Sequence, residues 1–195
     1  MSFFKNIFNS PKDKEPKESG LEFQGLPLDQ IFVQKFIKNN GKFLYCTTLD
    51  EVTDNLTEIV QENNWKKLIC NDPDLLKLIN STSIKTTKKF TNNFPLFVGC
   101  EHLIAENGGI LLSSNQLKET KISDLSADFI VYATTSQIVN TKGESLTGIK
   151  TRYKGNIPSN ISAIKNYNPD CKEKDFMSYG NTNSKNLYLL LFEDL

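Results

Sequence analysis

Apolar residues recur every three or four positions in three segments of the first half of the chain, a spacing typical of helices with one buried face. The segments are residues 28–40, 49–63 and 73–79. Gly41 follows the first segment and is a common residue at a helix end. Thr48 and Glu51 form a capping-box pattern before the second. Asp72 and Pro73 make a favourable start for the third, so all three segments are predicted to be helices.

Short apolar runs of strand length alternate with these helices. In the first half they cover residues 43–46, 67–70 and 84–90, and in the second half 101–105, 109–114, 128–133, 161–165 and 187–192. Gly108 and Gly109 predict a tight turn between two of the strands. A further helix is expected within parts of 137–153, although Gly143 and Gly148 interrupt it. The alternation predicts an α/β fold of three layers, with a mixed, largely parallel sheet and helices on both of its faces.

Two segments are too polar to join the core. Residues 9–20 mix charges with two prolines and are predicted to be a disordered linker, so we expect a flexible tail over 1–20 and one α/β domain over 21–195. Before the linker, a helix would place four apolar residues on one stripe: Phe3, Phe4, Ile7 and Phe8. That stripe could dock on a partner, another copy or a membrane surface, or the tail could fold back or stay disordered.

The asparagine-rich segment 166–186 is predicted to be an exposed lid or loop.

Composition narrows the class of protein. The 195 residues carry 23 basic and 23 acidic side chains, and Arg152 is the single arginine. A nucleic-acid-binding protein usually has a basic excess and arginine forks, so we expect no nucleic-acid partner. No apolar run approaches the roughly 20 residues of a membrane span. The N-terminus is too short and interrupted for a signal-peptide core, and we therefore expect a cytoplasmic protein.

The sequence predicts neither a metal site nor a cofactor. The four cysteines are dispersed without a CxxC pair, which favours reduced, buried thiols: Cys46, Cys70, Cys100 and Cys171. His102 is the only histidine and lies at the expected start of a strand. It could act as a lone acid or base, but without a local triad pattern we favour a structural role.

Glu106 is the candidate catalytic residue. It would end a strand and is followed by Asn107, Gly108 and Gly109, whose backbone a ligand could approach closely. Glu106 would then act as a base or nucleophile, and the turn amides would bind a phosphate or carboxylate oxygen. Alternatively, Glu106 only holds the turn through backbone amides while the glycines supply positive φ angles.

A second candidate binding segment follows the strand 128–133. Thr134, Thr135 and Ser136 offer hydroxyls and amides for a small anionic ligand, although capping of the next helix is the commoner use of such residues. Lys150 and Arg152 could pair with a carboxylate or phosphate, or could be surface charges only.

Several segments together resemble the LUD-domain family. They are Leu103-Ile-Ala-Glu-Asn-Gly-Gly-Ile-Leu-Leu-Ser-Ser, Ala127-Asp-Phe-Ile-Val-Tyr-Ala-Thr-Thr-Ser-Gln-Ile-Val and Leu187-Tyr-Leu-Leu-Leu. The family shows an Ala-Glu-Thr-Gly-Thr-Leu motif between two strands and then a strand and turn before Ser-Gln-Ile-Val. The order and spacing are similar here, and the resemblance covers most of residues 21–195.

The resemblance implies a fold similar to the ribose-phosphate isomerase and CoA-transferase group. It also implies a role in L-lactate oxidation to pyruvate, as a non-redox subunit or accessory beside iron–sulfur subunits. Autonomous CoA-transferase or phosphosugar-isomerase chemistry, or a binding module without catalysis, are the alternatives. Two departures suggest a divergent branch. Asn107 and Gly109 replace threonines, and the family's Gly-Pro-Ser-Arg-Thr-Ala-Asp-Ile-Glu-like segment has no counterpart after Ile164.

Overall fold

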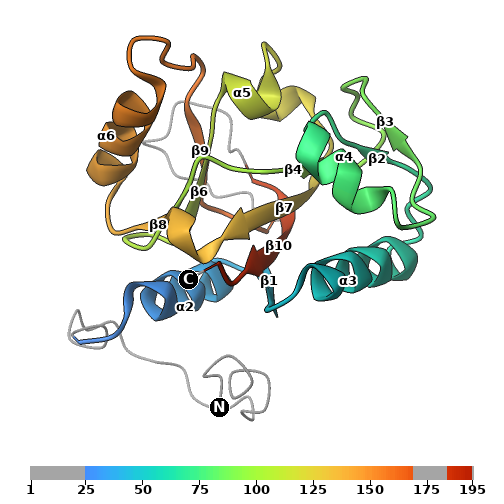
Figure 1. The fold of residues 1–195 in the computed structure, drawn as a ribbon, viewed down its shortest axis with the longest axis horizontal. Coiled ribbons are helices and arrows are strands. Elements are labelled where there is room, and N and C mark those ends of the chain that lie inside the picture. Colours follow the sequence, from blue (N-terminus) through green and yellow to red (C-terminus); the bar gives the residue numbers. More distant parts are fainter. Residues whose placement is uncertain (1–24, 169–183, 195) are drawn as a thin grey trace.

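The computed structural model describes residues 25–168 and 184–194 (Figure 1). Within these ranges six strands form one parallel sheet in the order β1-β10-β7-β4-β2-β3. Their bounds are β1 Lys42–Cys46, β2 Leu68–Ile69, β3 Thr86–Thr87, β4 Leu96–Val98, β7 Asp128–Thr134 and β10 Asn186–Phe192. The predicted α/β fold is confirmed.

A second, smaller sheet holds the other four strands of the described chain, in the order β8-β5-β6-β9. Their bounds are β5 His102–Ile104, β6 Gly109–Leu112, β8 Ile138–Val139 and β9 Ser162–Ile164. Strands β5 and β6 pair antiparallel, with Ile104 opposite Gly109, so the predicted tight turn joins two strands of a hairpin. The sequence pattern did not show that these strands leave the main sheet, because strand pairing depends on contacts between distant segments.

The helices lie on both faces of the parallel sheet and on the outer side of the second sheet. The α-helices are α2 Leu28–Lys38, α3 Leu49–Glu62, α4 Pro73–Ile79, α5 Ser114–Leu117 and α6 Lys142–Tyr153, and short 3₁₀ turns are η1 Ile122–Asp124 and η2 Thr135–Gln137. Helices α3 and α4 share a core with one face of the parallel sheet, while α2 and the second sheet share a core with the other face. Helix α6 packs on the outer side of the second sheet, and Figure 1 shows it at the opposite end of the view from α4.

Strand β10 shows why the parallel sheet needs cover on both faces. Leu187, Leu189 and Leu191 join the core under α2 and the second sheet. Tyr188 and Leu190 join the core under α3 and α4. Since successive side chains of a strand point to opposite faces, a strand with both faces buried is apolar throughout, as in the printed sequence.

The local helix signals are confirmed in detail. The Thr48 hydroxyl accepts a hydrogen bond from the Glu51 amide at 3.1 Å, and the Asp72 carboxylate accepts one from the Asp74 amide at 2.8 Å. The end of α2 differs from the prediction in one respect, because Asn40, and not Gly41, has a positive φ of 67°. Gly41 is required for space instead, since a Cβ there would overlap the buried ring of Phe36.

Other boundaries needed correction. The strand expected over 84–90 is reduced to Thr86–Thr87, and β4 was not predicted as a separate strand. The helix expected within 137–153 begins only at Lys142, after η2 and β8. The tail 1–20, the Phe3–Phe8 stripe, Cys171 and most of the polar segment 166–186 lie outside the described residues. Within the described chain, every helix is too short or too polar to cross a membrane.

Candidate functional site

Glu106 follows β5 and reaches the beginning of α6. Its side chain is exposed, and its carboxylate accepts a long hydrogen bond of 3.4 Å from the amide of Lys142, the first residue of α6. Its backbone carbonyl accepts a hydrogen bond from the Lys35 ammonium at 2.8 Å. The carboxylate is therefore exposed and lies next to the positive end of the α6 dipole.

The three residues after Glu106 fit closely against α2. The Gly109 amide donates to the Asn107 side chain at 2.9 Å, and Tyr167 donates to the Gly108 carbonyl at 2.7 Å. Gly108 has φ of +65°, and a Cβ there would lie 2.6 Å from the backbone nitrogen of Phe36. The turn thus needs its first glycine for conformation and for close approach to α2, which supports the structural interpretation of Gly108.

The segment after β7 holds a carboxylate of this same chain. Thr135 and Ser136 hydroxyls donate to Asp194 at 2.8 and 2.6 Å, and the Ser136 amide donates at 2.9 Å. Desolvation would raise the pKa of Asp194, but these hydrogen bonds outweigh it and lower the pKa to about 2. The Thr134 amide donates to the Gln137 side chain, and the Thr134 hydroxyl lies 2.9 Å from the Ser136 hydroxyl and also helps to lower the pKa of Asp194. Thr135 and Ser136, which were predicted to bind an anionic ligand, therefore bind the carboxylate of Asp194 in the structure.

The structure does not bring the two predicted groups into direct contact. Glu106 bonds to Asn140 and Lys142, whereas Thr135 and Ser136 bond to Asp194. No hydrogen bond or ion pair between described residues joins Glu106 to the segment after β7.

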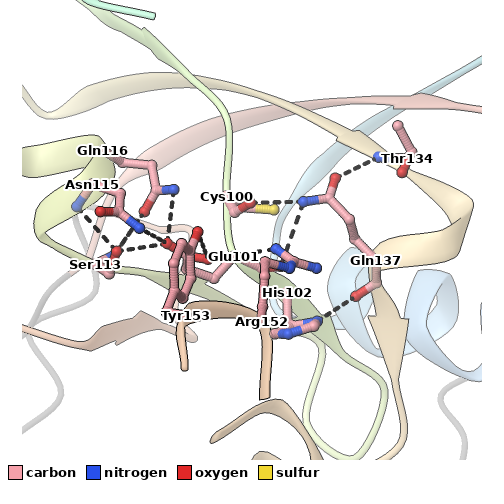
Figure 2. A network of polar contacts seen from close by, with 10 residues as sticks. All are labelled: Cys100, Glu101, His102, Ser113, Asn115, Gln116, Thr134, Gln137, Arg152 and Tyr153. Carbon is pink, nitrogen blue, oxygen red and sulfur yellow. Dashed lines mark hydrogen bonds and ion pairs between the residues drawn. The ribbon is translucent and has the colours of Figure 1, made fainter. Parts of the chain in front are cut away.

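Glu101 forms a buried polar centre that the sequence interpretation missed (Figure 2). The residue is 1% exposed and lies between β4 and β5. One carboxylate oxygen accepts hydrogen bonds from three side chains near α5, namely Ser113 at 2.6 Å, Asn115 at 3.0 Å and Gln116 at 3.0 Å. The other oxygen accepts from the Tyr153 hydroxyl at 3.1 Å, so Glu101 connects β5 with α5 and α6.

These bonds keep Glu101 ionised. Burial alone would raise the pKa of Glu101, but the hydrogen bonds from Ser113, Gln116, Asn115 and Tyr153 outweigh it and lower the pKa below its usual value. Arg152 lies 3.7 Å away and is 48% exposed. The single arginine of the sequence thus lies beside this buried carboxylate. The sequence signal that could have revealed this buried centre is the carboxylate of Glu101 inside the otherwise mostly apolar run 96–104.

Gln137 and His102 complete the centre. The Gln137 side chain donates to the Cys100 carbonyl at 2.7 Å and accepts from the Thr134 amide, so it joins the ends of β4 and β7 (Figure 2). The His102 Nδ1 atom lies 3.3 Å from the Gln137 carbonyl and must donate to it. His102 Nε2 is buried without a partner among the described residues. It faces α6, where a Cβ on Gly148 would lie 2.9 Å away.

We expect the stability of the protein to fall as the pH falls below about 6.5, the ordinary pKa of histidine. Burial, reinforced by Arg152, lowers the pKa of His102 when the chain is folded. The unfolded chain therefore binds the proton more readily, and acid favours unfolding. Urea unfolding at about pH 5.5 and 7.5 measures the difference, because His102 is the only histidine and carboxyls titrate lower. His102→Asn keeps a donor for Gln137 and should reduce the difference; an unchanged pH dependence would contradict this origin.

The described residues contain no group of three or more histidine, cysteine, aspartate or glutamate side chains placed to hold a metal ion. Three cysteines of this part are buried as free thiols: Cys46, Cys70 and Cys100. Of the carboxylates discussed, Glu101 is saturated with donors and Asp194 is held by Thr135 and Ser136. The Glu106 carboxylate is exposed and accepts one long hydrogen bond, from the Lys142 amide.

The fold and these polar centres define an α/β protein with a parallel sheet, two helices on one face, and a helix and a smaller sheet on the other. A solved structure of a DUF162 family protein from Deinococcus radiodurans is similar, with a TM-score of 0.58 and 11% sequence identity. The match covers 86% of this chain and 99% of that chain. Comparisons with protein-family models and with curated proteins find no match. At this identity the likeness shows a shared fold alone.

Proposed function

We propose that this chain is a divergent LUD-domain protein of the cytoplasm that serves L-lactate utilisation as a non-redox subunit or accessory of an iron–sulfur oxidation complex. DUF162 is the older name of the LUD-domain family. The observation that supports the proposal most is the agreement of two independent likenesses. The motif order of the sequence resembles that family, and the fold matches a DUF162 protein over nearly its whole length.

The state of the described thiols supports a redox centre in a partner. Burial raises the pKa of Cys46 and Cys100, and it raises the pKa of Cys70 to about 11. An iron–sulfur cluster is bound by thiolates, which these environments disfavour.

An autonomous enzyme of the CoA-transferase or phosphosugar-isomerase type is the second candidate. Glu106 favours it, because an exposed carboxylate beside the first turn of α6 could act as a base or nucleophile. Thr135 and Ser136, whose hydroxyls donate to the Asp194 carboxylate, offer donors of the kind that a small anionic ligand needs. A binding module without catalysis is the third candidate, because Arg152 is the only arginine and is paired with Glu101.

Anaerobic affinity purification of the full chain from lactate-grown native cells tests these candidates. We expect iron–sulfur subunits to co-purify in stoichiometric amounts, without iron in the isolated chain itself. Glu106→Gln should leave this association intact, because an accessory role does not need the carboxylate. Glu119→Gln, at another exposed glutamate, is the matched control.

Two results would redirect the assignment. A CoA ester or sugar phosphate that co-purifies with the wild type and the control, but not with Glu106→Gln, would replace the accessory role with the enzymatic one. Purification of the chain without iron–sulfur subunits and without such a metabolite would leave the binding module. Stoichiometric iron in the isolated chain would overturn the non-redox assignment.

A further inference from the structure

A cavity of about 460 Å³ opens between α3 and α4 beside the carboxyl-terminal part of β7. Its apolar lining comes from both helices and the sheet: Leu49, Leu75, Leu78 and Tyr132. Leu49 is 50% exposed, although it is the first residue of α3 and has a large apolar side chain. A cavity of this volume is large enough for ligand side chains, and an apolar segment that covered Leu49 would remove that surface from water.

The rim of this cavity is acidic on balance. Asp50 and Asp74 lie in the first turns of α3 and α4, and the single lysine of the lining, Lys77, is paired with Asp74 at 2.8 Å. A second cavity of about 370 Å³ differs in charge, because Lys66 and Lys85 line it together with Trp65 and others. An apolar segment that carries a positive charge therefore suits the cavity between α3 and α4 and not the basic one.

We propose that the Phe3–Phe8 segment of this same chain docks in the cavity between α3 and α4. The segment lies outside the described residues, and its sequence carries the required chemistry. Phe3, Phe4, Ile7 and Phe8 would cover the apolar lining, and Lys5 would lie near Asp50 and Asp74. Aromatic side chains bury large areas on docking and are the usual anchors of such contacts.

The connection between the segment and the domain permits this contact. Residues 9–24 could span roughly 50 Å when extended, whereas a domain of this size has a radius of gyration of about 16 Å. The composition of residues 9–20 predicts a flexible linker. A tether of this length, if flexible as the composition predicts, would provide an effective concentration on the order of millimolar, which favours even a weak contact with the cavity.

Photo-cross-linking of the full chain tests the proposal. Phe4 is replaced by p-benzoylphenylalanine, the purified protein is irradiated at low concentration, and the cross-linked residues are identified by mass spectrometry. We expect cross-links within one chain to residues that line the cavity. Leu49→Gln should reduce their yield roughly tenfold, because the loss of one apolar contact should lower the equilibrium constant of docking by about that factor. Leu146→Gln is the matched control, since Leu146 is 40% exposed on α6.

The charge part of the proposal has its own comparison. Lys5→Glu should reduce the yield, Lys14→Glu in the linker should not, and Asp50→Lys combined with Lys5→Glu should restore it.

Cross-links between two chains would show that a second copy is the occupant and would overturn docking within one chain. Cross-links spread over the surface, or equal yields in Leu49→Gln and Leu146→Gln, would overturn the cavity as the site. None of these outcomes depends on the proposed role in lactate utilisation.

Discussion

Replacing Glu101 with Ala is expected to lower the free energy of unfolding by about 4 kcal/mol, because it removes a buried charge from a set of groups arranged around it. Ser113, Asn115 and Gln116 would lose their shared acceptor. Ser113 is fully buried, and a buried donor that loses its partner costs about 1–3 kcal/mol. The side chain also fills the space between β5, α5 and α6. Urea unfolding at pH 7 measures the change.

Two further variants separate charge from shape. Glu101→Gln keeps the shape but replaces one acceptor oxygen with a donor, so we expect an intermediate loss. Glu119→Ala removes an exposed carboxylate and should change stability by less than about 0.5 kcal/mol. If Glu101→Ala were as stable as Glu119→Ala, the buried network would not contribute to the stability of the fold.

Replacing Gly108 with Ala is the second large expected effect, a loss of about 3 kcal/mol. Two costs combine at this position. A φ of +65° disfavours any residue with a Cβ by about 1–2 kcal/mol, and the new Cβ would lie 2.6 and 2.7 Å from backbone atoms of Phe36 and Lys35. A helix backbone cannot move aside as a side-chain end can, so α2 and the hairpin would separate locally. Thermal and urea unfolding measure the change.

Gly143→Ala is the matched control for this change. Gly143 lies in α6 without positive φ, and a Cβ there would meet the Thr141 hydroxyl at an ordinary 3.7 Å. Because alanine suits a helix better than glycine, stability should be unchanged or rise by up to about 1 kcal/mol. Equal effects at Gly108 and Gly143 would contradict the close approach of the hairpin to α2.

The parts of the fold that were predicted correctly depend on near neighbours in the chain. The caps at Thr48 and Asp72 involve residues two or three positions away, and the hairpin between β5 and β6 follows from adjacent glycines. Such signals are present in any short window of sequence. The α/β class follows in turn from the alternation of these elements.

The parts that were missed depend on distant segments. Strand β4 is three residues long and pairs with β2 and β7, which lie far from it in the sequence. The donors to Glu101 come from residues 113–116 and from Tyr153, and no local pattern relates them. Sequence reasoning left open whether Arg152 pairs with a carboxylate or is only a surface charge, and the fold places it beside Glu101, some fifty positions away.

The candidate site divides in the same way. From the sequence alone, the turn at Glu106 and the hydroxyls after β7 could be named, because residue types and their neighbours indicate which groups could bind an anion. The amino-acid order also determined the helix starts, the hairpin and the α/β class, since these arise from periodicity and local hydrogen bonds. Only the tertiary structure decided that Asp194 meets Thr135 and Ser136, that Gly108 packs on α2, and that Glu101 is enclosed by donors from α5 and α6. Those contacts join residues from 12 to more than 50 positions apart, and they form only when packing of the two sheets brings separate segments together.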